Sequence, residues 1–518
     1  MTEIQEDLAN CGLWMSNADR FKRLMGTGTH GSLKARSIRA AFWTSASSFA
    51  DFALRIGSIA VTARLIIPEH FGLFMMVTAI TAIVEQVREL GLSSATVQRQ
   101  SLSHAEVSNL FWINTGASLV LALLLLAASP LVASYYREPR LIALTASLAI
   151  NTFLGGFLVQ HQALLTRKLK MGATAAVRLL ASVLSTGLCI GLAALDYGYW
   201  ALVLREISRT VILVSGVWIC LPWIPSLPDR SVSVRPLLNF GANLTLANIL
   251  SSITGALDRF LLGRLWGAAH VATYRQAYQL ITAPNDQLLS PVYQVVHPTL
   301  SRLQGEPERF RRYFGRLLMI VGFVTMPISL FTAVYAREVT LLLLGPEWAA
   351  SAPVVRILSI STFAMQCANC TFFVLLTTGR SRMYLKLSLM NQAASLTGIL
   401  AGVSWGPIGL AVASATGTYL LLIPKVYFAL RESSFSMRDY FGTLRRPFIA
   451  SVVMAAVLLA SKSTLVHAIP SNTLCVLVAC LCSALLVGAV WMLQPGGVAE
   501  IRMMVESVVT SAKRKAAA

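Results

Sequence analysis

Fourteen predominantly apolar stretches, each 19 to 28 residues long, constrain the fold of this chain more than any other feature. A helix of about 20 such residues crosses the hydrocarbon core of a bilayer. We therefore expect an all-α polytopic membrane protein with about 14 transmembrane helices. The predicted spans are residues 40–67, 72–90, 110–134, 141–165, 173–195, 197–221, 237–262, 272–296, 317–336, 354–377, 385–403, 408–430, 448–468 and 474–493.

The composition excludes a cytosolic enzyme. Hydrophobic residues make up 55% of the 518 residues, charged residues only 13%, and the mean hydropathy is +0.65. Soluble chains carry about 25% charged residues, so this chain has too little polar surface to cover soluble cores. No apolar run precedes residue 40, and we expect no cleaved signal peptide.

The basic residues predict the orientation. Of the 43 lysines and arginines, 29 lie in the two tails and the even-numbered connections, and seven lie in the odd-numbered connections. By the positive-inside rule, both termini are expected in the cytoplasm. The basic loops 309–316 and 438–446 are interpreted as topogenic signals that contact anionic lipid, and no nucleic-acid partner is expected.

A weak internal repeat predicts two halves. At an offset of 200 residues, Ala63-Arg64-Leu65 aligns with Gly263-Arg264-Leu265. Two parallel-repeat six-helix bundles, related by an axis along the membrane normal, are expected around a central cavity, with two further helices at the C-terminal end. The predicted parts are a cytoplasmic tail (1–39), an N-lobe (40–221), a cytoplasmic linker (222–236), a C-lobe (237–430), a cytoplasmic loop with the last two spans (431–493) and a cytoplasmic amphipathic tail (494–518).

Arginines inside the spans are the candidate binding residues. There are seven: Arg55, Arg88, Arg178, Arg205, Arg209, Arg259 and Arg275. Each costs a few kcal/mol at mid-bilayer unless it is hydrated or paired. Polar residues also recur at steps of three and four along the first and seventh spans, which favours a water-filled cavity over a dry bundle.

Two interpretations of these arginines remain open. In the first, they only pair with local acids and hold helices together, which fits Glu85 with Arg88. In the second, they bind an anion, because the guanidinium fork suits bidentate contacts with phosphate. Arg178, which has no acid within one turn, favours the second. The candidate substrate-binding residues are Arg55, Arg178, Arg205, Arg209, Arg259 and Arg275.

Prolines in the eighth span predict a bent or broken helix. They recur at seven-residue steps as Pro284, Pro291 and Pro298, and each removes one backbone hydrogen bond. Such breaks line cavities and serve gating in transporters. The candidate coupling or gating residues are Asp51, Asp258, Pro284, Asp286 and Pro291. Coupling to H⁺ or Na⁺ stays open, whereas no other cofactor and no metal site are predicted, because Cys367 and Cys370 lack a second ligand pair.

Four segments resemble a known family. Residues 63–74 read ARLIIPEHFGLF, and residues 258–265 read DRFLLGRL; segments 89–95 and 344–348 add shorter matches. They are similar to the bacterial polysaccharide (Wzx-type) flippases of the multidrug/oligosaccharidyl-lipid/polysaccharide exporter superfamily. Ile67 stands where these proteins usually have glycine.

The resemblance implies a flippase of the bacterial inner membrane, not an enzyme. Its substrate would be an undecaprenyl-diphosphate-linked oligosaccharide repeat unit, moved to the periplasmic leaflet by alternating access for exopolysaccharide, capsule or lipopolysaccharide O-antigen synthesis. A polysaccharide polymerase and a chain-length regulator would be its partners. A multidrug or metabolite antiporter of the same superfamily and a lipid II flippase are alternatives. A membrane glycosyl polymerase fits less well, because the odd-numbered connections are short and hold no cluster of His and acids.

Overall fold

The computed structural model describes residues 50–494, except residues 90–92, 94–95, 98, 100–101, 169, 230, 233–234 and 470. The predicted N-terminal tail, the start of the first span and the predicted amphipathic tail lie outside the described residues.

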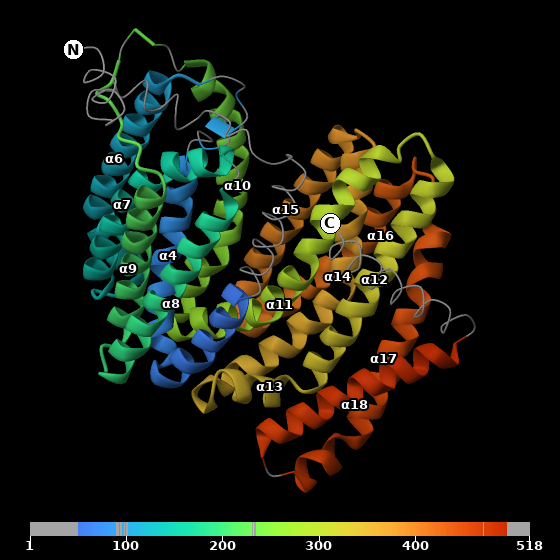
Figure 1. Ribbon diagram of the computed structural model, residues 1–518. Helices are drawn as coiled ribbons and strands as arrows, with labels where there is room; N and C mark the ends of the chain where they lie inside the picture. Colours follow the sequence, from blue (N-terminus) through green and yellow to red (C-terminus); the bar gives the residue numbers. More distant parts are fainter. Residues whose placement is uncertain are drawn as a thin grey trace, which may run out of the picture. The chain divides into compact units, whose positions relative to one another are not determined.

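Among the residues described, each predicted span overlaps one helix, and no strand occurs in this part of the chain (Figure 1). Nine helical stretches among these residues are long and apolar enough to cross a membrane. The predicted all-α polytopic fold is confirmed. The helices are one through residues 50–65, then α4 (Pro68–Glu89), α6 (His104–Tyr136), α7 (Leu141–Arg167), α8 (Met171–Ala194), α9 (Tyr199–Cys220), α10 (Arg235–Trp266), α11 (Ala268–Arg302), α12 (Pro307–Val334), the short α13 (Ala336–Leu343), the 3₁₀ helix η1 (Pro346–Ser351), α14 (Ala352–Thr377), α15 (Ser381–Gly402), the 3₁₀ helix η2 (Val403–Trp405), α16 (Gly406–Leu430), α17 (Met437–Ala468) and α18 (Asn472–Leu493).

The two basic segments predicted as loops are helical. Residues 309–316 form the first turns of α12, and residues 438–446 form the first turns of α17. A capping box starts α17, in which the Ser436 hydroxyl accepts from the backbone N–H of Asp439 and the Asp439 carboxylate accepts from that of Ser436. Hydropathy locates the membrane part of a helix and misses such polar ends, because capping rather than burial begins the helix.

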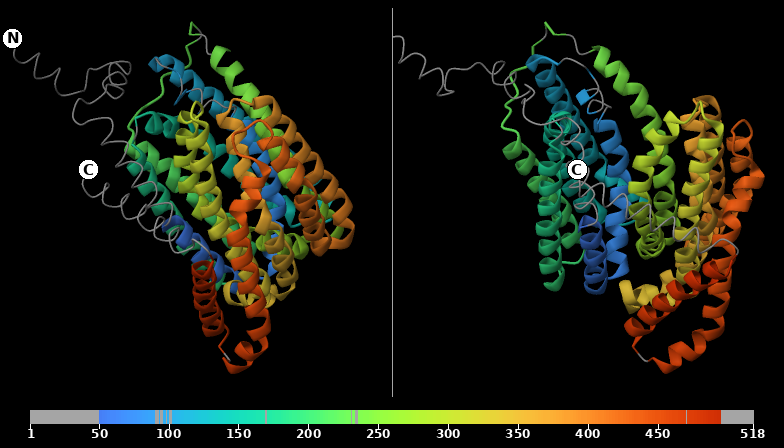
Figure 2. Two further views of the ribbon diagram at one scale, coloured as in Figure 1. Left: turned by 90° about the vertical axis from the view of Figure 1, so that its right-hand side faces the viewer. Right: turned by 45° about the vertical axis from the view of Figure 1, so that its right-hand side comes forward.

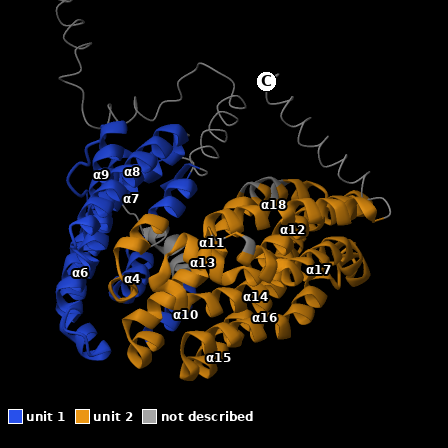
Figure 3. Cartoon of the chain, turned by 90° about the horizontal axis from the view of Figure 1, so that it is seen from below, with its two compact units in different colours: residues 1–58, 73–260 blue, residues 59–72, 261–518 orange. Residues whose placement is uncertain are grey.

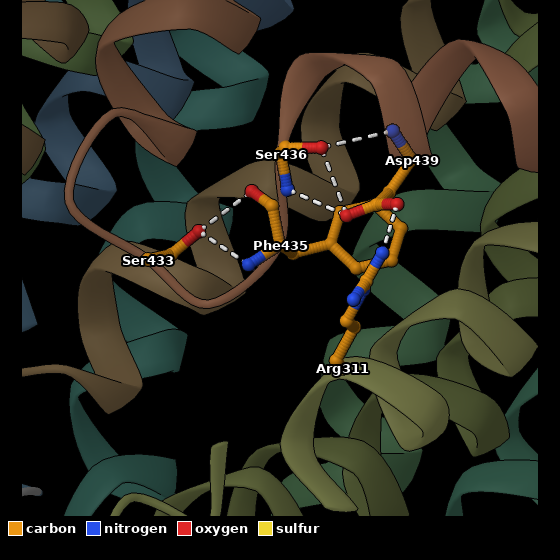
Figure 4. A network of polar contacts seen from close by, with 5 residues as sticks. All are labelled: Arg311, Ser433, Phe435, Ser436 and Asp439. Carbon is orange, nitrogen blue, oxygen red and sulfur yellow. Dashed lines mark hydrogen bonds and ion pairs between the residues drawn. The ribbon is translucent and has the colours of Figure 1, made fainter. Parts of the chain in front are cut away.

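The same cap ties α17 to α12 (Figure 4). Asp439 Oδ1 accepts a charge-assisted hydrogen bond from Arg311 Nη2 at 2.6 Å. In the turn before the cap, the Ser433 hydroxyl donates to the carbonyl of Phe435 and accepts from its N–H. The Phe435 ring packs edge-on against Phe314 of α12, with 4.9 Å between ring centroids. A polar contact and an aromatic contact therefore fix the start of α17.

Packing divides the chain into two compact units (Figure 3). Unit 1 comprises residues 1–58 and 73–260, and unit 2 comprises residues 59–72 and 261–518. In unit 1, α6 packs along α7, and α9 packs along both α7 and α8. In unit 2, α14 packs against α11, α12 and α16, and α17 and α18 form a hairpin (Figure 2). The predicted bounds of the two lobes stay a prediction.

The segment after α9 is bound to the first turns of α6. The Asn109 side chain donates to the carbonyl of Asp229 at 2.7 Å and accepts from its N–H at 2.8 Å. The Trp112 indole donates to the carbonyl of Ser226 at 2.8 Å. Trp223 is buried and donates to Nδ1 of His104 at 3.0 Å. Residues 223–229, in the middle of the chain, are thus part of unit 1.

Two of the family-like segments contact each other in unit 2. Trp348 is 1% exposed, and its indole donates to the carbonyl of Ala63 at 2.8 Å. Its ring meets Phe71 edge-on, with 5.3 Å between centroids. Arg64 Nη2 also donates to the carbonyl of Leu342 at 2.7 Å. We name the contact of residues 63–72 with residues 342–348 the Trp348 junction.

Candidate functional site

A polar pocket of about 260 Å³ lies among α4, α7, α8 and α9 of unit 1. We call it the arginine pocket. Each of the four helices contributes polar or charged side chains to its wall. The lining residues are Glu85, Arg88, Asn151, Gly155, Leu158, Gln162, Thr174, Val177, Arg178, Glu206, Arg209, Thr210, Leu213 and Val217.

Two helices present the same short motif to this pocket. Glu85 and Arg88 are three residues apart on α4, and Glu206 and Arg209 are three residues apart on α9. This spacing places both side chains of each motif on one helix face. Arg178 of α8 adds a third guanidinium, so three positive charges face two negative ones. The charged residues give the pocket a net positive charge.

Arg88 is held in place by α7. Its Nη1 donates to the carbonyl of Thr152 at 3.3 Å. A Cβ atom at Gly155 would lie 1.9 Å from this Nη1, so the guanidinium occupies space that only glycine leaves open. The α7 backbone therefore positions Arg88 from two sides.

Arg209 is paired more loosely. Its Nη1 lies 3.6 Å from Oε1 of Glu206, and the two side chains are 42% and 33% exposed. A pair this long and this exposed holds its partners weakly. Because a guanidinium carries five N–H donors, Arg209 retains donors that an incoming anion can use.

Asn151 adds a further polar group to the pocket wall. It is 7% exposed and lines the pocket, and its Oδ1 has no hydrogen-bond partner among the described residues. A buried polar atom without a partner is costly, and native structures contain few of them. A ligand with a hydrogen-bond donor, or an intervening water, would satisfy this amide.

The structure brings together only some of the residues that sequence analysis selected. Arg178 and Arg209 share the arginine pocket, whereas Arg55, Arg205 and Arg259 belong to unit 1 without lining it. Arg205 lies one helical turn from Arg209 on α9.

Sequence analysis missed Arg88, which it interpreted as paired with a neighbouring acid, and Gly155. The repeated Glu-x-x-Arg motif on two spans was the available signal for Arg88. No signal pointed to Gly155, because its role depends on how α4 packs against α7.

Two of the candidate acids in unit 1 have local structural contacts. Asp51 accepts from the Ser182 hydroxyl at 2.6 Å and so links the first helix to α8. Asp258 is 7% exposed and accepts from the backbone N–H of Arg259 at 2.7 Å. Their assignment to coupling stays a prediction.

The candidate gating prolines lie within α11 of unit 2, which is continuous from Ala268 to Arg302. Next to Pro284, the buried Asn285 side chain donates to the carbonyl of Ile281 at 2.8 Å. Arg275 lies over the Tyr278 ring, with its Cζ 5.1 Å from the ring centroid.

Comparison with known proteins agrees with this architecture. The family described as "Polysaccharide biosynthesis protein" matches residues 61–353. The solved structure of lipid II flippase MurJ in an inward closed conformation is similar at a TM-score of 0.71 and 12% identity, covering 86% of this chain and 97% of that one. An inward-facing multidrug resistance MATE family transporter gives a TM-score of 0.58 at 16% identity, covering 73% and 93% of the two chains. These likenesses establish the fold.

Curated relatives carry the comparison further. The lipopolysaccharide biosynthesis protein WzxC of Escherichia coli K12 is 25% identical over 81% of this chain and 86% of its own length. The teichuronic acid biosynthesis protein TuaB of Bacillus subtilis is 24% identical over 82% and 89%, and the succinoglycan biosynthesis transport protein ExoT of Rhizobium meliloti is 23% identical over 80% and 84%. The chain belongs to the polysaccharide biosynthesis protein family, as a multi-pass membrane transporter of the bacterial Wzx-type flippase group.

Proposed function

We propose that this protein moves undecaprenyl-diphosphate-linked oligosaccharide repeat units from the cytoplasmic to the periplasmic leaflet of the inner membrane by alternating access, with the diphosphate bound in the arginine pocket. Relatives named for lipopolysaccharide, teichuronic acid and succinoglycan support a glycan substrate. The observation that carries the proposal is the convergence of Arg88, Arg178 and Arg209 on one pocket.

The chemistry of the substrate requires such a pocket. A sugar headgroup and a diphosphate cannot enter hydrocarbon unaided, because their polar groups would lose their hydration. The polyprenyl tail is apolar and remains in lipid. Guanidinium groups bind phosphate oxygens bidentately through strong charge-assisted hydrogen bonds. At about 260 Å³ the pocket suits a compact group such as a diphosphate better than a complete oligosaccharide.

Purely structural ion pairing accounts for less of the geometry. It accommodates Arg209 beside Glu206, but it gives no role to Arg178, which has no acid within one turn of α8. Structural ion pairing also does not account for the buried Asn151 amide oxygen, which has no hydrogen-bond partner among the described residues.

A strain that lacks this protein should stop exporting one polysaccharide and should accumulate lipid-linked repeat units on the cytoplasmic leaflet. The reason is that synthesis of the repeat units continues while their passage is blocked. Extraction of lipid-linked glycans, combined with a glycan-binding probe added to intact and to permeabilised cells, locates the units.

Other outcomes would contradict the proposal. Accumulation of cell-wall precursor instead would indicate a lipid II flippase. Repeat units accessible in intact cells would indicate a polymerase. Unchanged glycans together with increased drug sensitivity would indicate a multidrug antiporter.

We expect Gly155→Ala to weaken binding of undecaprenyl diphosphate about tenfold. The new methyl group would displace the Arg88 guanidinium and remove about one charge-assisted hydrogen bond, which is worth roughly 1.5 kcal/mol or more. Gly116→Ala on α6 is the matched control, because a Cβ there meets nothing within 4 Å. Titration of the two purified variants in detergent measures the difference. Equal affinities would show that the position of Arg88 does not matter for binding.

The remaining assignments stay predictions. They comprise the cytoplasmic location of both termini, coupling to H⁺ or Na⁺, gating by Asp51, Asp258, Pro284, Asp286 and Pro291, and work beside a polysaccharide polymerase and a chain-length regulator.

A further inference from the structure

A second pocket, of about 480 Å³, lies among α11, α14 and α15 of unit 2. We call it the aromatic pocket. Its volume falls within the range of about 300–1,000 Å³ that is typical of small-molecule sites. The lining residues are Tyr278, Thr282, Asp286, Tyr293, Met365, Gln366, Asn369, Phe372, Phe373, Leu376 and Tyr384.

Aromatic rings from all three helices line this pocket. Tyr293 of α11 packs against Phe373 of α14, with 4.9 Å between ring centroids. Phe372 of α14 meets Tyr384 of α15 at 5.6 Å, with an angle of 76° between the ring planes. Such pairs have defined geometry, so the rings form a fixed apolar surface.

Polar groups converge on the same space. Asp286 supplies a carboxylate, Asn369 and Gln366 supply amides, and Thr282 supplies a hydroxyl. No lysine or arginine is among the lining residues described. A carboxylate and two amides that faced lipid would be costly at membrane depth, so they indicate a hydrated pocket with a polar ligand.

We propose that the aromatic pocket binds a sugar ring of the transported glycan. A pyranose has faces of C–H groups, which pack on aromatic rings, and a rim of hydroxyls, which donate to carboxylates and exchange hydrogen bonds with amides. The lining supplies both kinds of group, whereas the arginine pocket has no aromatic lining residue. The inference rests on the proposed flippase function and adds to it a site that binds a sugar of the transported glycan.

The sugar ligand also explains why the two pockets differ in charge. Asp286 is the sole charged residue in the described lining of the aromatic pocket. Arg275 and Lys425 are not among these lining residues but lie over the Tyr278 and Phe372 rings. The arginine pocket has the opposite balance. The lining of the aromatic pocket therefore suits a sugar, and that of the arginine pocket suits a phosphate.

The test measures sugar binding directly. Methyl glycosides of glucose, galactose, mannose, N-acetylglucosamine and glucuronic acid are added to the full-length protein in lipid nanodiscs, and saturation-transfer NMR reports which of them bind. Tyr384→Ala should weaken binding of the preferred glycoside about three- to tenfold, and Tyr384→Phe, which keeps the ring, should retain most of it. Asn369→Leu should weaken binding about tenfold, because sugar hydroxyls would lose their partner.

Tyr427→Ala is the matched control. Tyr427 on α16 is exposed like Tyr384, and it also meets a phenylalanine, Phe428, at 5.3 Å and 71°. It lies outside the lining of both pockets. This variant should bind glycosides as the parent does.

Several results would overturn the inference. The first is that no methyl glycoside shows saturation transfer from the protein. The second is that Tyr384→Ala and Tyr427→Ala give equal saturation transfer to the preferred glycoside. The third is that the protein binds tetraphenylphosphonium through Tyr384 but binds no glycoside. Undecaprenyl diphosphate, titrated in parallel, separates this inference from the proposed function. Tyr384→Ala should bind it normally, and an equal loss of both ligands would contradict a sugar-specific role.

Discussion

Alanine at Arg88, Arg178 and Arg209 together should weaken binding of undecaprenyl diphosphate at least about 100-fold and should reduce polysaccharide export to the level of a deletion strain. Each guanidinium in the arginine pocket can donate charge-assisted hydrogen bonds worth roughly 1.5–3 kcal/mol, and loss of two such bonds already corresponds to more than 100-fold. Titration of the purified protein and quantification of exported polysaccharide at matched protein levels measure the two effects.

Arg205→Ala provides the control for this prediction. Arg205 lies one turn from Arg209 on the same helix and does not line the pocket, so its replacement should leave binding nearly unchanged. Lysine at position 209 should give intermediate affinity, because it keeps the charge and loses the bidentate geometry. If Arg209→Gln abolished export and the double variant Glu206→Gln, Arg209→Gln restored it, the pair would be structural and the phosphate role would be wrong.

Trp348→Ala should destabilise unit 2 by about 3–5 kcal/mol, the usual result of emptying a buried aromatic site. The change would remove the ring from the Trp348 junction and leave the carbonyl of Ala63 without its donor. Thermal unfolding in detergent and the amount of protein in the membrane measure the loss.

Trp348→Phe should be less destabilising than Trp348→Ala, since it keeps one ring beside Phe71 while it loses the indole N–H and part of the ring volume. Trp405→Ala is the control, because Trp405 is 73% exposed. Equal stability of the Trp348→Ala and Trp405→Ala variants would show that the junction contributes little.

Hydropathy was sufficient to predict the fold class because a bilayer imposes the length and apolarity of each span. It did not predict the first turns of α12 and α17, where charged residues such as Arg311 and Asp439 lie on helix that extends past the apolar run. Local capping and pairing decide those boundaries, and neither changes the mean hydropathy of a segment.

The arginine pocket was only partly predictable. The shortage of nearby acids drew attention to Arg178, which lines the pocket. The same criterion excluded Arg88 as a binding candidate, because Glu85 lies three residues away and, when only one helix is considered, is interpreted as its ion-pair partner. The convergence of α4, α7, α8 and α9 is a tertiary property, and it puts two such pairs into one site.

The aromatic pocket was less predictable still. Tyrosines and phenylalanines within apolar runs look like ordinary core or lipid-facing residues. Of its lining, sequence analysis had selected only Asp286 as a candidate, and for coupling rather than binding. The pocket forms only where α11 packs near α14 and α15, which follow it much later in the chain.

The chain crosses between the two units at three places: after Ser58, after Gly72 and after Phe260. Each crossing falls inside a continuous helix, namely the one through residues 50–65, α4 and α10. A helix resists sharp bending because successive turns are hydrogen-bonded to one another. The three connections between the units are therefore stiff helical segments rather than flexible linkers. A sharp bend at any of these three positions would therefore break backbone hydrogen bonds within a helix.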